Sequence, residues 1–316
     1  RLDPIVLRRF IKCMDYDVKK TKALIELNYN LRNKNCNIYI DRDMNDEKTA
    51  QALKASDVVL LPGVTPERHR LLVFRMADYD PRSVTITIPT FVSSLLNTML
   101  HDLCAQRNSE QEAKVFFMLS DTRFTEPDIQ LDQLDDVMEV DEDAEGKSGS
   151  YRPDADLADG DVHIVDIKGY TMRHLAYVSI FVLRVQMKFL QEAYPSRLKA
   201  IHFINCPSFL DRMLTIMRPF IREEILQLVS QSRYKSNSNC SNHFSLFQMH
   251  YHVDGMESLY ELIPRDMLPN EYGGKAGSMD ELKAQWLQKL DENTPYLQDD
   301  KYWRITSASK SRWSWF

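Results

Sequence analysis

Short apolar runs alternate with longer helical patterns along this sequence, and the alternation limits its possible folds more than any other feature. Strands separated by helices form a largely parallel sheet with right-handed crossovers. Each short run is apolar on both faces, as in a sheet that is covered on both sides. We therefore predict an α/β fold. The strand-like runs lie at 162–167, 200–206 and 246–253, and the helical patterns lie at 90–106, 175–194 and 208–230.

The N-terminal part of the sequence has a different pattern. Apolar residues recur at helical spacing from 3 to 32, and the polar residues 15–17 interrupt them, which predicts a helical hairpin. A polar helical stretch follows at 45–54. Two apolar runs flank a Pro-Gly turn and predict a pair of strands at 58–61 and 71–76.

These patterns divide the chain into three units. The sequence starts at Arg1 within a helical pattern, so we expect the first unit to be truncated at its start. The units are a helical N-terminal domain at 1–55, a main domain at 56–275 with an acidic insertion at 126–161, and a C-terminal helix with an aromatic tail at 276–316.

Negative charge is concentrated in that insertion. The formal net charge of the chain is -6, but 126–161 holds fourteen acidic residues against Lys147 and Arg152. The rest of the chain therefore carries +6 and can approach anionic surfaces. The insertion has too little apolar surface to order itself, so we expect it to be mobile.

Cysteine spacing and the length of the apolar runs indicate the compartment. The five cysteines are scattered and form no C-x-x-C pair, which favours a reducing compartment over a disulfide framework. The most apolar stretch, 174–194, is interrupted by Arg184, Gln186 and Lys188, so it does not predict a membrane span. We expect a cytoplasmic protein.

The sequence gives little support for catalysis. His250 and His252 share one strand face and could begin a metal site with His202 or Cys206, but strand histidines that lack a closely spaced third ligand are mostly structural. The G-x-S-x-G, P-loop and G-x-G-x-x-G motifs do not occur. Asp166 is interpreted as a structural carboxylate. We predict a protein with no catalytic residue and no metal.

Several separated motifs agree with one family in order and spacing. The chain resembles the CRAL-TRIO family, on its branch with the alpha-tocopherol transfer protein and cellular retinaldehyde-binding protein. The resemblance implies a helical domain beside a domain whose mostly parallel sheet forms the floor of a lipid cavity, with a mobile gate helix as its lid. The motifs are LRRFI at 7–11, YDV at 16–18, YDP at 79–81, HIVDIKG at 163–169, YPSR at 194–197, IHFIN at 201–205 and LPNEYGG at 268–274.

The helical pattern at 208–230 occupies the position of that gate. Apolar residues cover more than the single stripe of a surface helix, which is also the pattern of an ordinary buried helix. Pro219 removes a backbone hydrogen bond and is expected to kink the helix. The predicted gate residues are Phe209, Leu210, Met213, Leu214, Met217 and Phe220.

The resemblance also implies the residues that line the cavity. Ser94 and Thr98 would place two hydroxyls on one helical face, where they either satisfy a polar group of the ligand or bond to helix carbonyls. The predicted lining residues are Phe91, Ser94, Thr98, Val165, Ile167, Phe189, Leu190, Tyr194, Leu198 and Phe203.

The resemblance further implies membrane contact, including contact with phosphoinositides, through basic residues near the gate. Two positions depart from the family pattern, because Glu224 and Gln248 replace basic residues, and scattered basic residues are often only a solvated surface. The predicted contacts are Arg197, Lys199, Arg218 and Arg222.

We therefore expect a monomer that binds and transfers a tocopherol, retinoid or carotenoid type of lipid, contacts membranes transiently and does not bind nucleic acid. It would need no cofactor apart from the bound lipid. Two alternatives stay open: a phosphatidylinositol or phosphatidylcholine exchange protein on the same fold, and an adaptor whose bound lipid is regulatory and whose acidic insertion recruits a partner.

Overall fold

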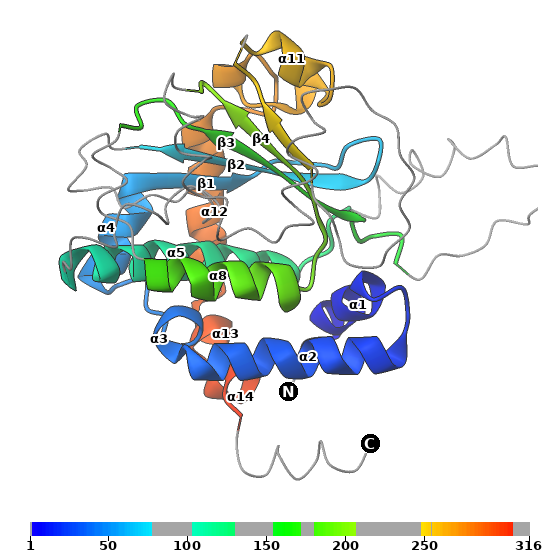
Figure 1. Cartoon of the computed structure of the whole chain (residues 1–316), viewed down its shortest axis with the longest axis vertical. Coiled ribbons are helices and arrows are strands. Elements are labelled where there is room, and N and C mark those ends of the chain that lie inside the picture. Colours follow the sequence, from blue (N-terminus) through cyan, green and yellow to red (C-terminus); the bar gives the residue numbers. More distant parts are fainter. Residues whose placement is uncertain are drawn as a thin grey trace, which may run out of the picture.

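A five-stranded sheet forms the centre of the protein, in the order β1-β2-β3-β4-β5 (Figure 1). The computed structural model describes residues 2–77, 103–129, 154–171, 180–206, 248–253 and 255–305. Its strands are β1 Ser56–Leu60, β2 His69–Met76, β3 Gly160–Asp166, β4 Leu198–Ile204 and β5 Gln248–Tyr251.

The topology confirms the predicted α/β fold. β1 pairs antiparallel with β2, as the Pro-Gly turn between them predicts, and β2 to β5 are all parallel. The three inner strands are buried along almost their whole length. Burial on both faces explains why these strands show no apolar-polar alternation in the sequence.

Two crossover helices, α5 Leu103–Phe124 and α8 Ile180–Glu192, lie on one side of the sheet (Figure 1). The prediction of a helix that ends near Gln106 is wrong, because α5 continues to Phe124. Phe116 and Phe117 explain the continuation. As neighbouring helical residues they point about 100° apart, so they pack against two different parts of the core. Phe116 contacts Phe74 of β2, with 5.9 Å between ring centroids, and Phe117 points to the N-terminal helices.

The first three N-terminal helices pack on the side of α5 and α8 that faces away from the sheet, and the fourth contacts both α5 and edge strand β1 (Figure 1). Asp3 caps α1 and Asp17 caps α2 by accepting hydrogen bonds from backbone N–H groups, so the predicted hairpin is confirmed. The helices are α1 Pro4–Cys13, α2 Val18–Lys34, α3 Cys36–Tyr39 and α4 Glu47–Ala55.

The C-terminal helix α12 Met279–Glu292 runs beside edge strand β1. A capping box of Ser278 and Glu281 starts the helix, and the Trp286 indole N–H donates to the Leu60 carbonyl at 2.9 Å. After α13 Thr294–Gln298 and α14 Asp300–Trp303, the chain reaches the N-terminal helices. Trp303 is buried there, under the guanidinium groups of Arg32 and Arg42.

The two ends of the acidic insertion meet each other and α1. The backbone N–H groups of Asp128 and Ile129 donate to the Asp156 carbonyl at 2.8 and 3.1 Å. Arg9 pairs with Asp128 at 2.5 Å, and Lys12 pairs with Asp159 at 2.7 Å. The expectation that the whole insertion is too acidic to order is therefore wrong at both ends, where α1 supplies the compensating charge.

None of the described helices is long and apolar enough to span a bilayer.

Candidate functional site

The two faces of the sheet have different surroundings. Phe74, Val165 and Phe203 share the face that α5 and α8 cover, which we call the helix face. Because side chains alternate along a strand, Ile164 and Ile204 belong to the opposite face. The predicted lining residues on or next to β3 and β4 can be assigned by reference to these two faces.

Val165 and Phe203 pair with each other in the register of β3 and β4 and lie on the helix face. Both are fully buried, and the Phe203 ring stacks on Tyr251 at 5.2 Å. Ile167 follows β3, is buried, and donates its backbone N–H to the Ile204 carbonyl at 3.1 Å. These three side chains belong to the packed core, and their contact with a lipid stays a prediction.

Phe189 and Tyr194 both pack against α5 but contact different residues of that helix. Phe189 stacks on Tyr39 at 4.6 Å and meets Phe117 edge-on at 5.0 Å, so it packs between the crossover helices and the N-terminal helices. Tyr194 packs against Phe124 at 5.1 Å and donates its hydroxyl to Ser120 at 3.1 Å. Burial raises the pKa of Tyr194 well above its usual value, so the phenol stays protonated.

Leu190 and Leu198 are half-buried and pack against the core. The other predicted site residues lie outside the described residues. They are Phe91, Ser94 and Thr98 of the cavity wall, Phe209, Leu210, Met213, Leu214, Met217 and Phe220 of the gate, and Arg218 and Arg222 of the membrane contact.

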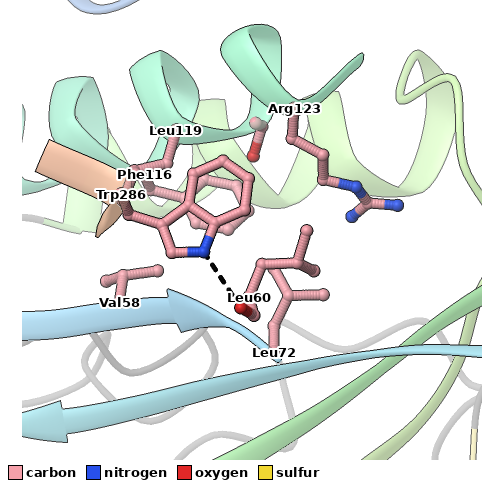
Figure 2. A pocket seen from close by; sticks show the side chains of 8 residues that line it. Val58, Leu60, Leu72, Phe116, Leu119, Arg123 and Trp286 are labelled. Atoms are coloured by element: carbon pink, nitrogen blue, oxygen red, sulfur yellow. Dashed lines mark hydrogen bonds between the residues drawn. The ribbon is translucent and has the colours of Figure 1, made fainter. Parts of the chain in front are cut away.

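A small pocket lies on the helix face between β1, β2, α5 and α12 (Figure 2). Figure 2 shows the indole of Trp286 at its centre, with the hydrogen bond to Leu60. The pocket has room for about one water molecule, which is far too little for a lipid. Its lining residues are Val58, Leu60, Leu72, Phe116, Leu119, Ser120, Arg123 and Trp286.

The opposite face combines an aliphatic centre with polar residues near β5. Val73, Ile164 and Ile204 are fully buried on this face, whereas the two crossover helices lie on the other side of the sheet. His202 of β4 and His250 of β5 are paired across the parallel ladder on this same face. A small polar group therefore adjoins a buried aliphatic patch, which is part of the hydrophobic core.

Three histidines form a stacked ladder at that position. The His202 and His250 rings stack at 4.6 Å, and the Nδ1 atom of His202 lies 3.0 Å from the Nε2 atom of His252. The Nδ1 atom of His252 lies 2.8 Å from the Ser258 hydroxyl. Each of these contacts needs one donor and one acceptor, which neutral imidazoles provide.

Burial keeps the ladder neutral. It lowers the pKa of His252 to about 4 and also lowers the pKa of His202, and a neighbouring imidazole adds to both shifts. Burial raises the pKa of the nearby Cys206 thiol to about 11. Within the part of the chain that the structure describes, no three His, Cys, Asp or Glu residues are arranged to hold a metal ion.

Asp166 joins the C-terminal ends of the strands to the later LPNEYGG segment. Its carboxylate accepts hydrogen bonds from the Tyr272 hydroxyl at 2.9 Å, from the Asn205 side chain at 2.8 Å and from the Lys168 backbone at 2.9 Å. In the same segment, a Cβ on Gly274 would lie 1.9 Å from the Leu268 carbonyl oxygen, so only glycine fits there. These contacts give the motif a structural role.

Arg197 lies at the start of β4, where the turn between α1 and α2 contacts it. Its guanidinium pairs with Asp15 at 2.6 Å and donates to the Cys13 carbonyl at 2.8 Å. Lys199 is half-buried, and burial lowers its pKa, with the neighbouring charge of Arg197 adding to the shift. Membrane contact by these two residues stays a prediction.

The histidines were predicted from the sequence only as metal candidates, and the aliphatic centre of the opposite face was not predicted. The signal was present in the spacing. His202, His250, Ile164 and Ile204 all have even residue numbers in these three strands, whereas Val165 and Phe203 have odd ones, so the two sets alternate between the faces.

Comparisons with known proteins match both parts of the chain. Residues 156–274 match the family model for the CRAL/TRIO domain, and residues 1–49 match that for the Pinta-like, UBA domain. The alpha-tocopherol transfer protein-like protein of Mus musculus is 31% identical over 127 residues, which are 40% of this chain and 31% of that relative.

Two further relatives belong to a second group. Clavesin-2 of Rattus norvegicus is 25% identical over 150 residues, which are 48% of this chain and 38% of the relative. Clavesin-1 of Xenopus laevis is 24% identical over 115 residues, which are 36% of this chain and 29% of the relative. The matched segments thus span about a third of the length of each curated relative.

Proposed function

We propose that this chain, which belongs to the CRAL/TRIO domain family, binds one small hydrophobic lipid and transfers it between membranes without catalysing a reaction. The ligand class that we propose is the tocopherol, retinoid or carotenoid type. The protein would work in the cytoplasm and contact membranes transiently.

The opposite face of the sheet is the observation that carries this proposal. It is aliphatic at its centre, through Val73, Ile164 and Ile204, and polar near β5, through His202 and His250. A lipid with a long hydrocarbon part and one polar group would match this arrangement of an aliphatic part beside a polar part. Burial of its hydrocarbon would contribute about 0.8 kcal/mol per methylene, and a neutral imidazole can exchange a hydrogen bond with its polar group.

The comparisons support the same class of ligand. The segment that matches the CRAL/TRIO domain contains β3, β4 and β5, the strands that carry Ile164, Ile204 and the histidine ladder. One relative is named as similar to a transfer protein for alpha-tocopherol. We extend that class of cargo to this chain as part of the proposal.

The described polar groups support a non-catalytic role. Three donors occupy the carboxylate of Asp166, and the raised pKa of Cys206 keeps its thiol protonated at neutral pH. The ring nitrogens of His202 and His252 that face each other are also in hydrogen-bond contact. The Ser258 hydroxyl lies 2.8 Å from the Nδ1 atom of His252, but burial lowers the pKa of this imidazole to about 4, which makes it a weak general base.

The experiment is native mass spectrometry of the purified full chain, followed by solvent extraction and absorption spectra. We expect one small apolar molecule per chain, with near-ultraviolet or visible bands if it is a retinoid or carotenoid. A copurified phospholipid would replace the proposal with the exchange-protein alternative. Absence of any lipid, before and after incubation with tocopherol and retinaldehyde, would overturn both.

A matched pair of variants on one strand tests the face. Ile201 and Ile204 are both buried in β4, on the helix face and on the opposite face respectively. We expect Ile204→Phe to change the amount or identity of the bound lipid. Ile201→Phe should cost about 1–3 kcal/mol of stability through overpacking and leave the lipid unchanged. The reverse result would assign the lipid to the helix face.

A further inference from the structure

A continuous chain of hydrogen bonds runs from the histidine ladder to the segment that follows β5. The Nδ1 atom of His202 lies 3.0 Å from the Nε2 atom of His252, and the Nδ1 atom of His252 lies 2.8 Å from the Ser258 hydroxyl. That hydroxyl also lies 3.2 Å from the Gly255 carbonyl oxygen. These groups are therefore joined in one line that begins on β4 and ends at a backbone carbonyl.

The carbonyl at the end of this line fixes the direction of every hydrogen bond in it. A carbonyl oxygen can only accept, and a hydroxyl group has a single hydrogen. Both contacts of Ser258 are satisfied only if its hydroxyl donates to Gly255 and accepts from the Nδ1–H group of His252. The Nε2 atom of His252 is then an acceptor, because a neutral imidazole carries one hydrogen.

The same reasoning assigns the tautomer of His202. Because the Nε2 atom of His252 accepts, the hydrogen between the two rings belongs to the Nδ1 atom of His202. The Nε2 atom of His202 therefore carries a lone pair and can only accept. Burial lowers the pKa of both rings, so they stay neutral and keep this arrangement at neutral pH.

The lone pair of His202 is the open end of this line. His202 is only 3% exposed, yet none of the residues that the structure describes donates a hydrogen bond to its Nε2 atom. In an imidazole side chain Nε2 lies across the ring from Cβ, so it is farther from the strand than Nδ1 is. A buried acceptor without a donor is unfavourable, so a ligand that supplies a donor at this atom would bind better.

The neighbours of His202 orient its ring beside the aliphatic centre of the opposite face. In the register of the sheet His202 pairs with Ile164 of β3 on one side and with His250 of β5 on the other. The His250 ring stacks on it at 4.6 Å, with 13° between the two planes. The Nε2 atom of His250 itself lies 3.3 Å from the side-chain oxygen of Gln248, which occupies it. The acceptor that borders the aliphatic centre is therefore the Nε2 atom of His202.

We propose that His202 accepts a hydrogen bond from a hydroxyl group of the bound lipid, so that the site selects alcohols and phenols over aldehydes, ketones and ethers. This inference rests on the proposed function and narrows its ligand class to lipids with a free hydroxyl group. A carbonyl or ether oxygen would place a second lone pair against Nε2. A site that hydrogen bonds one substrate group strongly rejects analogues that lack it. Ser258 does not touch the lipid and acts as a positioning residue, because it sets the tautomer of His202.

The test compares lipids that share their hydrocarbon part. Retinol is paired with retinaldehyde, and α-tocopherol is paired with its methyl ether, which keeps the oxygen but lacks the hydrogen. Each lipid is titrated into the full chain after copurified lipid has been removed, and quenching of tryptophan fluorescence gives the dissociation constant.

The variants separate the acceptor from its surroundings. His202→Phe removes the acceptor but keeps an aromatic ring in the stack, and Ser258→Ala removes the group that sets the tautomer. The control is His250→Phe, which replaces the neighbouring ring and leaves the line of hydrogen bonds intact. Circular dichroism and thermal unfolding check that each variant is folded.

We expect the wild-type chain and the control to bind the hydroxyl lipid of a pair about ten-fold more tightly than its partner. His202→Phe should reduce this preference to about two-fold or less, because the acceptor is gone. Ser258→Ala should reduce it to about three-fold, because both tautomers of His252 then become accessible. The ¹⁵N chemical shifts of the imidazoles report the tautomers directly, and we expect Nδ1–H for both His202 and His252 in the wild type.

Three results would overturn the inference and leave the proposed function standing, because lipid still binds in each case. They are an Nε2–H tautomer of His202 in the wild type, equal or tighter binding of the carbonyl and ether lipids, and a full preference for the hydroxyl lipids in His202→Phe. The tautomer and Ser258→Ala test the inference even if His202→Phe does not fold. Failure of the wild type to bind any of these lipids would count against the proposed function instead.

Discussion

The helix face and the opposite face of the sheet are equally buried but are built from different chemistry. The helix face packs aromatic rings and buries the ion pair between Arg123 and Asp161, whose atoms approach to 2.6 Å. The opposite face has aliphatic side chains at its centre and polar groups nearer the strand ends, where Arg75 pairs with Asp57 at 2.6 Å, Asp166 accepts three hydrogen bonds and the neutral histidines stack. The centre of the sheet is therefore packed by aromatic rings on one side and by aliphatic side chains on the other.

This difference separates a scaffold from a surface that can accept different neighbours. Edge-to-face rings and paired charges have one good arrangement, so they fix the positions of the strands and helices. Aliphatic side chains pack against many shapes with similar energy. A sheet with one face of each kind can hold its shape while the contacts on the aliphatic face change. Four predictions test this comparison.

The largest effect is expected for the aromatic cluster. Phe189→Ala should lower the free energy of unfolding by about 3–5 kcal/mol, because the ring is fully buried between Tyr39 and Phe117. Phe181→Ala is the control on the same helix, since Phe181 is 55% exposed, and should change stability by about 0.5 kcal/mol or less. Urea unfolding measures both. Similar losses in the two variants would show that the buried contacts of Phe189 do not stabilise the fold more than an exposed ring does.

The next effect is a loss of stability in acid. His252 has a folded-state pKa of about 4, below its ordinary value of about 6.5, so its contribution is complete above pH 6.5 and declines as the pH falls toward 4. Between pH 7 and pH 5 the wild type should lose about 2 kcal/mol more than His252→Gln does. Urea unfolding at both pH values gives the difference. Parallel pH profiles would show that His252 is already solvated when folded.

Replacement of His163, the histidine of the helix face, should raise the stability of the protein. His163 is buried beside Phe74, and neither ring nitrogen has a hydrogen-bond partner among the described residues. His163→Leu should therefore raise stability by about 1 kcal/mol at pH 7. His202→Leu is the control and should lower stability, because His252 loses its partner. Destabilisation by both changes would mean that a buried water already satisfies His163.

The smallest effect is expected at the centre of the opposite face. Ile164→Val removes one methyl group and should cost about 1 kcal/mol in chemical unfolding. Ile201→Val makes the same change on the helix face, and an equal cost for both variants would mean that both faces are packed with equal rigidity. The comparison between the two faces would then no longer hold.

The sequence predicted the fold better than the site, for a physical reason. Strands and helices follow from local periodicity, and the pairing of β1 with β2 follows from a short turn. The two faces of a parallel strand are both apolar, so the choice between Val165 and Ile164 depends on which side the crossover helices take. Contacts between residues far apart in the sequence determine that side, as the contact between Phe74 and Phe116 shows.

Long-range charge pairing was also beyond local reasoning. Arg9 and Asp128 are 119 residues apart, yet they form a buried pair at 2.5 Å. The sequence shows an acidic segment and a basic helix but gives no distance between them. The gate, by contrast, was inferred from family resemblance, and its residues lie outside the described part of the chain.

The closed base of the acidic insertion affects how the segment can be altered. Because Ile129 and Asp156 share a backbone hydrogen bond, a short linker could replace 130–153 without moving either anchor. Removal of the entire 126–161 region would be a different operation. It would also take away Asp128 and Asp161, and would leave Arg9 and Arg123 as buried cations without their carboxylates. Reporter groups or alternative loops are therefore best grafted between 130 and 153.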